Sequence, residues 1–284
     1  MGTLKRSFTL VRTSWGVLRQ DKELIVLPVL SIIAAGILVL PFFIGAIAVG
    51  ATSDSDSLGP VGWILMFIGY LVGAYVTIFF QTALVLGAND RLTGGNPTLG
   101  SALSMAASNA GRILPWAIIS ATVSVVLQAI QERAGAIGRI VVGLVGLAWT
   151  LVTMLVLPIL VIEQVGVKDA FSRSATAFKR TWGENVVGNG GIGIVGFLGT
   201  LLGLVVAGPI VALGVSRSAT WLVVLGVVLF VLWVLLVSAF TSALSAVFRT
   251  ALYRFAVLGE EPTGFSHEQI AGAFRPRSKA APAT

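Results

Sequence analysis

Cysteine is absent from this chain of 284 residues, and histidine occurs once, as His267. Without cysteine the chain cannot form disulfides, thiolate zinc sites or iron–sulfur centres. The sequence also contains no phosphate-binding loop, zinc-protease helix, haem-ligand pattern or nucleophile elbow. We therefore predict no metal and no cofactor, and we predict that the protein is not an enzyme.

Charged residues are also scarce: they make up 11% of the chain, whereas 56% of it is hydrophobic. A soluble domain has about 25% charged residues, which cover its surface in water. A protein surface in contact with a lipid bilayer does not need charged residues, so the composition predicts a membrane protein. Residues 1–23 are mostly polar and basic, and the apolar run that follows is too long for a signal peptide. We therefore predict no cleaved signal.

Six apolar segments are long enough to cross a bilayer, which takes about 20 helical residues. We predict an all-α polytopic protein whose proline-containing spans are kinked at Pro41, Pro158 and Pro209. Residues 1–258 form the membrane domain in this prediction, and residues 259–284 form a partly disordered cytoplasmic tail. The predicted spans are residues 24–50, 61–88, 113–131, 137–162, 186–214 and 219–248.

Lysine and arginine are distributed unevenly between the two sides of these spans. Of the 19 basic residues, 16 fall on the side that holds both termini, and the connection at 51–60 has none. Basic residues favour the cytoplasmic side of a membrane. The sequence therefore predicts three helical hairpins in the cell (inner) membrane, closed on the outer side, with both termini cytoplasmic. The net charge of +7 is explained by this orientation, and we expect no nucleic-acid partner.

Amphipathic segments precede the predicted hairpins. In residues 4–23 and again in 167–185, apolar side chains recur at i, i+4, i+7 and i+11, which is one helical face. Residues 98–116 repeat the spacing more weakly. We predict helices at the cytoplasmic membrane interface, and their recurrence before each hairpin suggests a threefold repeat. The alternative is that they pack on the inner end of the bundle. The apolar positions are Leu4, Phe8, Val11 and Trp15, then Leu103, Ala107, Ala110 and Leu114, then Phe171, Ala175, Phe178 and Trp182.

Polar residues near the inner ends of the spans are the candidate site. Buried polar groups in a membrane often mark a cavity or a ligand contact. The alternative is structural: the carboxylates cap helices and pair with neighbours such as Arg173, Lys179 or Arg180. The candidates for polar or lipid contact are Gln81, Asn89, Asp90, Arg91, Glu163, Arg180, Trp182, Glu184 and Asn185.

Small and hydroxylated residues mark two further spans. The fifth span is rich in glycine, and its Gly199 and Gly203 have the GxxxG spacing that allows close helix contact. We predict a central, closely packed helix, with a flexible transport helix as the alternative. The sixth span carries four hydroxyls near its inner end, which we expect to bond to their own helix: Ser238, Thr241, Ser242 and Ser245.

The chain resembles a family of uncharacterised prokaryotic membrane proteins over roughly residues 4–255. The most distinctive strings are RLTGGNPT at 91–98 and TWGE at 181–184. The layout of amphipathic segments and hairpins is also similar, more distantly, to the membrane domain attached to some glycerophosphodiester phosphodiesterases. The resemblance implies the fold and leaves the function open.

Two functions fit these observations. The favoured hypothesis is a non-enzymatic protein that binds lipid or acts as an accessory or scaffold, because the predicted inner face is basic and aromatic. Its expected partners are membrane lipids, especially anionic ones, and an integral membrane protein or a second copy of the chain. The alternative is a transporter or channel for a small or amphipathic solute, which Gln81 and the glycine-rich fifth span favour.

Overall fold

The computed structural model describes residues 14–16, 18–19, 22–51, 58–182 and 190–260. These residues form helices joined by short turns, and no strand occurs among them. Six of the helices are long and apolar enough to cross a membrane. The predicted all-α fold with six spanning helices is therefore confirmed.

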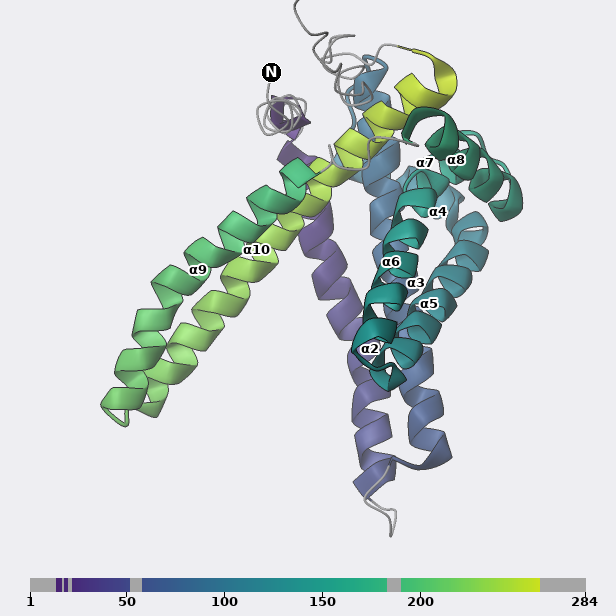
Figure 1. Ribbon diagram of the computed structural model, residues 1–284. Helices are drawn as coiled ribbons and strands as arrows, with labels where there is room; N and C mark the ends of the chain where they lie inside the picture. The colour runs from purple at the N-terminus through teal and green to yellow at the C-terminus, as the bar shows by residue number, and fades with distance from the viewer. Residues whose placement is uncertain (1–13, 17, 20–21, 52–57, 183–189, 261–284) are drawn as a thin grey trace, which may run out of the picture.

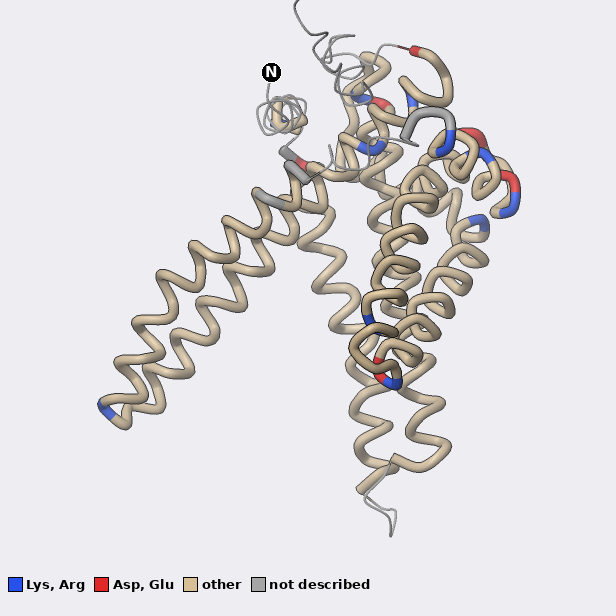
Figure 2. The backbone as a smooth tube through the Cα atoms, viewed as in Figure 1, with Lys and Arg blue, Asp and Glu red and all other residues tan. Residues whose placement is uncertain are grey.

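The long helices form three hairpins whose turns lie at the same end of the molecule (Figure 1). The short elements gather at the opposite end, where most of the charged residues also lie (Figure 2), and we call this the basic end. The hairpins are α2 (Val26–Ala51) with α3 (Gly59–Leu92), α5 (Ala110–Arg133) with α6 (Ala136–Thr153), and α9 (Gly190–Ser216) with α10 (Thr220–Tyr253). The short elements are η1 (Lys22–Ile25), α4 (Leu99–Ser108), α7 (Val156–Ile162), α8 (Val167–Trp182) and η3 (Arg254–Leu258).

Pro158 breaks the fourth span instead of bending it. A proline lacks the N–H that would bond to the carbonyl four residues earlier, and its ring clashes with that carbonyl. The affected carbonyl belongs to Met154, and the helix is interrupted at that point, between the end of α6 at Thr153 and the start of α7 at Val156. Pro41 and Pro209 differ, because each lies inside a helix that continues past it.

Glycines hold the first hairpin together. A Cβ at Gly69 would lie 2.9 Å from Cβ of Phe42, and one at Gly73 would lie 3.1 Å from Cγ2 of Val39. Both distances are too short for an unstrained side chain, so α2 and α3 approach closely only because these positions are glycine.

The prediction that the glycine-rich span is central is wrong. Helix α9 packs extensively on α10 alone and lies at the edge of the molecule (Figure 1). Its Gly199 and Gly203 lie against Val237 and Trp233 of α10, so the GxxxG pair makes close contact with a single neighbouring helix. The composition does not distinguish a central helix from a peripheral one, because both lipid and protein neighbours are apolar.

The amphipathic segments fold as helices whose buried faces pack on the bundle. In α8, Ala170, Ser174 and Ala177 are buried, and the Phe171 ring lies 5.9 Å from that of Trp149 in α6. Thr98 caps the start of α4, because its hydroxyl accepts from the Ser101 amide at 3.1 Å. Of the first segment, Leu4, Phe8 and Val11 lie outside the described residues, and Trp15 contacts Phe240.

Buried side chains and exposed apolar side chains occupy different halves of the bundle. The two clusters of buried residues join α3 and α10 to α5, α7 and α8 on one side and to α2 and α4 on the other. Toward the hairpin turns, large apolar side chains face outward, among them Ile47, Trp63, Val215 and Trp221. An apolar surface of this extent is stable in lipid and not in water, which makes this a multi-pass membrane protein.

Candidate functional site

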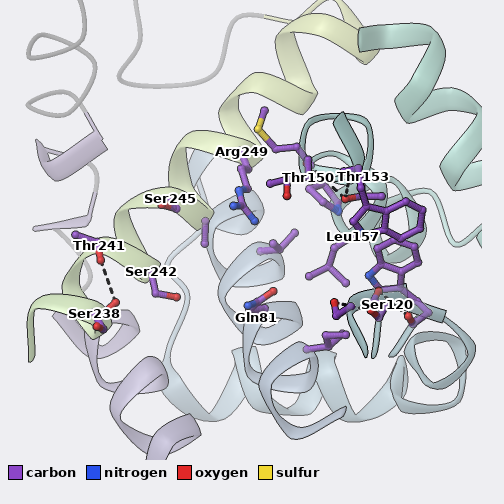
Figure 3. A pocket seen from close by; sticks show the side chains of 18 residues that line it. Gln81, Ser120, Thr150, Thr153, Leu157, Ser238, Thr241, Ser242, Ser245 and Arg249 are labelled. Atoms are coloured by element: carbon purple, nitrogen blue, oxygen red, sulfur yellow. Dashed lines mark hydrogen bonds between the residues drawn. The ribbon is translucent and has the colours of Figure 1, made fainter. Parts of the chain in front are cut away.

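A cavity of about 500 Å³ lies between α3, α5, α6, α7 and α10 (Figure 3). This volume is within the range of ligand pockets, about 300–1,000 Å³. One wall is aromatic, because Trp116 of α5 and Trp149 of α6 stack with ring centroids 6.1 Å apart. The other walls are rich in polar groups: Gln81, Ser120, Ser124, Thr150, Thr153, Ser238, Thr241, Ser242, Ser245 and Arg249.

These polar groups reach one cavity because each helix carries them as a stripe. Residues at i, i+3, i+4, i+7 and i+11 share a helical face. Positions 238, 241, 242, 245 and 249 of α10 have this spacing, and Ser120 and Ser124 lie one turn apart on α5. The polar stripe on α10 is visible in the sequence, but its convergence with those of α5 and α6 depends on the tertiary fold.

Several of the hydroxyls donate to their own helix. Ser120 donates to the Trp116 carbonyl at 2.8 Å, Thr153 to the Trp149 carbonyl at 2.7 Å, and Thr241 to the Val237 carbonyl at 2.9 Å. The prediction of backbone bonding is therefore confirmed for Thr241 and wrong for Ser238, Ser242 and Ser245, whose hydroxyls have no backbone partner within the described residues. Each hydroxyl oxygen keeps lone pairs that can accept a hydrogen bond from a ligand or from water in the cavity.

Arg249 is the only cationic side chain among the described residues that line the cavity. Its guanidinium points into the cavity, and Gln81 lies below it in the view of Figure 3. Within the described part of the chain it has no hydrogen-bond acceptor and no carboxylate partner. A charged group at this depth is costly unless it is paired or solvated, so such a residue is a candidate ligand contact.

Sequence reasoning missed Arg249. The predicted sixth span ended at Phe248, and the arginine was counted among the basic residues that follow it on the cytoplasmic side, because a charge normally ends an apolar run. Helix α10 instead continues to Tyr253, one turn beyond Arg249, so the side chain stays on the cavity face. The signal that would have found it is its position on the serine and threonine stripe.

Gln81 is the one predicted candidate that lines the cavity. It lies on α3 and is partly buried, and its side-chain amide has no hydrogen-bond partner within the described residues. The amide therefore offers two donors and an acceptor to whatever occupies the cavity. This placement fits the functional interpretation of Gln81 as a cavity residue.

The polar residues at the end of α3 make structural contacts. Asn89 accepts from Nη1 of Arg254 at 2.8 Å, and Arg254 also pairs with Glu260. Arg91 donates to the Asn96 side chain at 2.9 Å. The Asp90 carboxylate folds against the turn at Gly95, where a Cβ would meet its Oδ1 at 2.2 Å. None of the three predicted candidates Asn89, Asp90 and Arg91 lines the cavity.

Glu163 joins three elements at the basic end. It forms an ion pair with Arg173 of α8, and its other oxygen accepts from the Tyr253 hydroxyl of α10 at 3.0 Å. The contacts of Glu163 are thus separate from those of Asp90, as the pairing alternative predicts. Among the described residues no group of three or more histidines and carboxylates could hold a metal ion.

The remaining candidates are not placed by the structure. Arg180 and Trp182 belong to α8, and their side chains are outside the described part. Glu184 and Asn185 lie outside the described residues altogether.

The fold and the cavity define a multi-pass helical membrane protein with a polar, arginine-bearing cavity between its helices. The chain belongs to DUF6159, a family of unknown function whose model matches residues 60–265. This segment contains every helix that lines the cavity. Searches of curated proteins and of solved structures each give no significant match. The resemblance to an uncharacterised family is confirmed, whereas the similarity to phosphodiesterase membrane domains stays a prediction.

Proposed function

We propose that this protein is a non-enzymatic lipid-binding membrane protein whose central cavity holds the anionic headgroup of a lipid. The observation that carries the proposal is Arg249, a cation on a spanning helix that points into a cavity and has no partner among the described residues. A phosphate or carboxylate would pair with the guanidinium in a geometry that suits two parallel hydrogen bonds.

The rest of the lining complements an anion. The described residues around the cavity include no carboxylate, so nothing there repels a negative group. Gln81 and Ser245 supply further donors that can reach oxygen atoms of a headgroup.

The depth of Arg249 in the membrane also suits contact with a lipid headgroup. It lies four residues before Tyr253, where α10 ends, which is about 6 Å along the helix axis. Headgroups occupy the layer just outside the hydrocarbon core of the bilayer. An anionic lipid can therefore reach this arginine with its phosphate near the interface and its chains toward the membrane centre.

Lipid binding to the purified protein tests the proposal. The full chain in a mild detergent would be titrated with phosphatidylglycerol and with phosphatidylcholine, and bound lipids counted by native mass spectrometry. We expect the anionic lipid to bind preferentially and Arg249→Gln to weaken it about tenfold, which is about 1.4 kcal/mol. Lys168→Gln is the matched control, since Lys168 is exposed on α8 at the same end and lines no part of the cavity. Equal binding by wild type and Arg249→Gln would contradict the proposal.

Transport of a small or amphipathic solute is the second candidate, and one observation favours it. The break between α6 and α7 lies at the cavity, whose lining includes Met154, Leu157 and Pro158. Interrupted helices line the substrate sites of many transporters. Uptake of a labelled anionic lipid analogue into proteoliposomes tests this candidate, and a flux equal to that of protein-free vesicles would count against it.

The membrane, the orientation and the partners of the protein are part of the same proposal. We infer that the basic end faces the cytoplasm, which places both termini there in the cell membrane. An accessory role with an integral partner protein or a second copy is compatible with lipid binding. Pull-down from native membranes tests that role, and the absence of a stoichiometric partner would contradict it.

A further inference from the structure

An apolar groove of about 340 Å³ adjoins the cavity, between α2, α3 and α10. Three residues line both spaces, so the groove and the cavity meet at Gln81, Ser238 and Ser242. Beyond this junction two hydroxylated residues, Ser31 and Thr77, line the groove, and the other wall residues are apolar: Pro28, Ile32, Ala35, Phe80, Leu84 and Ala239.

We infer that the ligand of the cavity carries a hydrocarbon chain that lies in this groove. The inference rests on the proposed function and narrows its ligand class to an anionic lipid, as opposed to a small anion such as free phosphate. The cavity supplies the cation and the donors for the head, and the groove supplies an apolar surface that continues directly from it.

The order of these groups along α10 matches the order of groups in a lipid. Arg249 is nearest the basic end, Ser242 lies about 10 Å deeper and Ser238 about 16 Å deeper, at 1.5 Å per helical residue. A headgroup at Arg249 would thus place ester or glycerol oxygens beside the serines and direct a chain past them into the groove. Along α10 the charge lies nearest the basic end and the groove residues Ala239 and Ser242 lie deeper, whereas on α2 the groove begins at Pro28, near the start of the helix.

The groove is placed where a chain can enter it from the membrane. Ile32 on its rim is exposed, with 36% of its surface accessible. Figure 1 shows that the hairpin of α9 and α10 diverges from α2 beyond this level, so the groove lies at the point where these helices begin to separate. A lipid can therefore slide sideways between α2 and α10 without leaving the bilayer.

Two probes that share a phosphate test the inference. Lysophosphatidic acid has one acyl chain, whereas glycerol 3-phosphate has the same head and no chain. Binding of each to the full-length protein in detergent would be measured by native mass spectrometry and by protection against thermal unfolding, together with analogues of increasing chain length. We expect wild type to bind the long-chain probe at least about tenfold more tightly than glycerol 3-phosphate.

A groove-filling variant provides the second arm. Ala35→Trp places an indole in the groove from α2, where Ala35 is half-buried, and the groove's residues of α3 and α10 stay unchanged. We expect it to weaken lysophosphatidic acid about tenfold and to leave glycerol 3-phosphate binding at its wild-type value. Ala48→Trp is the control, since Ala48 is exposed on the same helix and lies outside the groove.

The outcomes separate the two proposals. If no anionic probe binds, or if Arg249→Gln binds like wild type, the proposed headgroup site fails. If lysophosphatidic acid binds through Arg249 but chain length has no effect on its affinity, the headgroup site stands and the chain-binding groove is overturned. The chain-length series uses the wild-type protein, so the inference stays testable even if Ala35→Trp does not fold.

Discussion

The indole N–H of Trp233 donates to the backbone carbonyl of Gly199 at 2.7 Å, across the hairpin of α9 and α10. The bond is possible because Gly203, one turn further along α9, leaves room for the indole ring. This hairpin packs on the other helices mainly through the inner part of α10, and Ile192 of α9 also packs on the buried clusters, so contacts between its own two helices largely determine its geometry.

Replacing Gly203 by alanine should destabilise the hairpin. The new Cβ would lie 2.1 Å from Cδ1 of Trp233, so the indole must move and lose its bond to Gly199. We expect a cost of about 1–3 kcal/mol, which thermal unfolding in detergent would measure. Gly193→Ala is the control, because a Cβ there meets nothing within 4 Å, and it should be neutral or slightly stabilising. Equal stability of the two variants would show that the close approach is not needed.

Replacing Tyr253 by phenylalanine should loosen the basic end. Tyr253 is fully buried, and its hydroxyl donates to Glu163, which also pairs with Arg173. A hydrogen bond to a charged group contributes about 1.5–3 kcal/mol, and we expect a loss of this size in the free energy of unfolding. Tyr70→Phe removes a hydroxyl from an exposed tyrosine and should cost little. If adding Glu163→Gln to Tyr253→Phe costs as much as it does alone in wild type, the two residues are not coupled.

Replacing Ser242 by leucine should separate ligand binding from stability. Ser242 lines both the cavity and the groove, and its hydroxyl has no partner within the described residues. An apolar side chain fits a spanning helix, so we expect unchanged or higher thermal stability and about tenfold weaker binding of lysophosphatidic acid. Ser216→Leu, near the hairpin turn of α9, is a control that should leave binding unchanged. A stable Ser242→Leu variant with wild-type affinity would remove the junction from the site.

The sequence predicts the helices of this protein better than it predicts the cavity. A bilayer imposes long apolar runs, so six spans and their hairpins follow from hydropathy and from the position of basic residues. Pro158 and the GxxxG pairs indicate where a helix breaks and where two helices touch. The neighbours of each helix do not follow, because apolar side chains suit lipid and protein alike.

Predicting the cavity from the sequence would require two kinds of information that no single segment contains. Arg249 directly follows an apolar run, so hydropathy places it outside the span, although its spacing from Ser238 and Ser245 places it on one helical face. Serine and threonine are common in spanning helices, so those of α5 and α6 do not stand out in the sequence. Only the tertiary fold brings their hydroxyls to the same cavity. Conversely, Asp90 and Glu163 stand out in the sequence as charges near the membrane, yet both lie at the basic end outside the cavity, Glu163 paired with Arg173 and Asp90 against the turn at Gly95.

The absence of cysteine makes the orientation directly testable. We expect a cysteine at Glu132, in the last turn of α5 beside its connection to α6, to react with a membrane-impermeant maleimide in intact spheroplasts. A cysteine at Lys168, in the first turn of α8, should react only after lysis, because the basic end faces the cytoplasm. Both positions are exposed, so a difference in labelling reports the side of the membrane and not burial. Labelling of Lys168→Cys but not Glu132→Cys in intact spheroplasts would reverse the orientation and would place the Arg249 site in the outer leaflet.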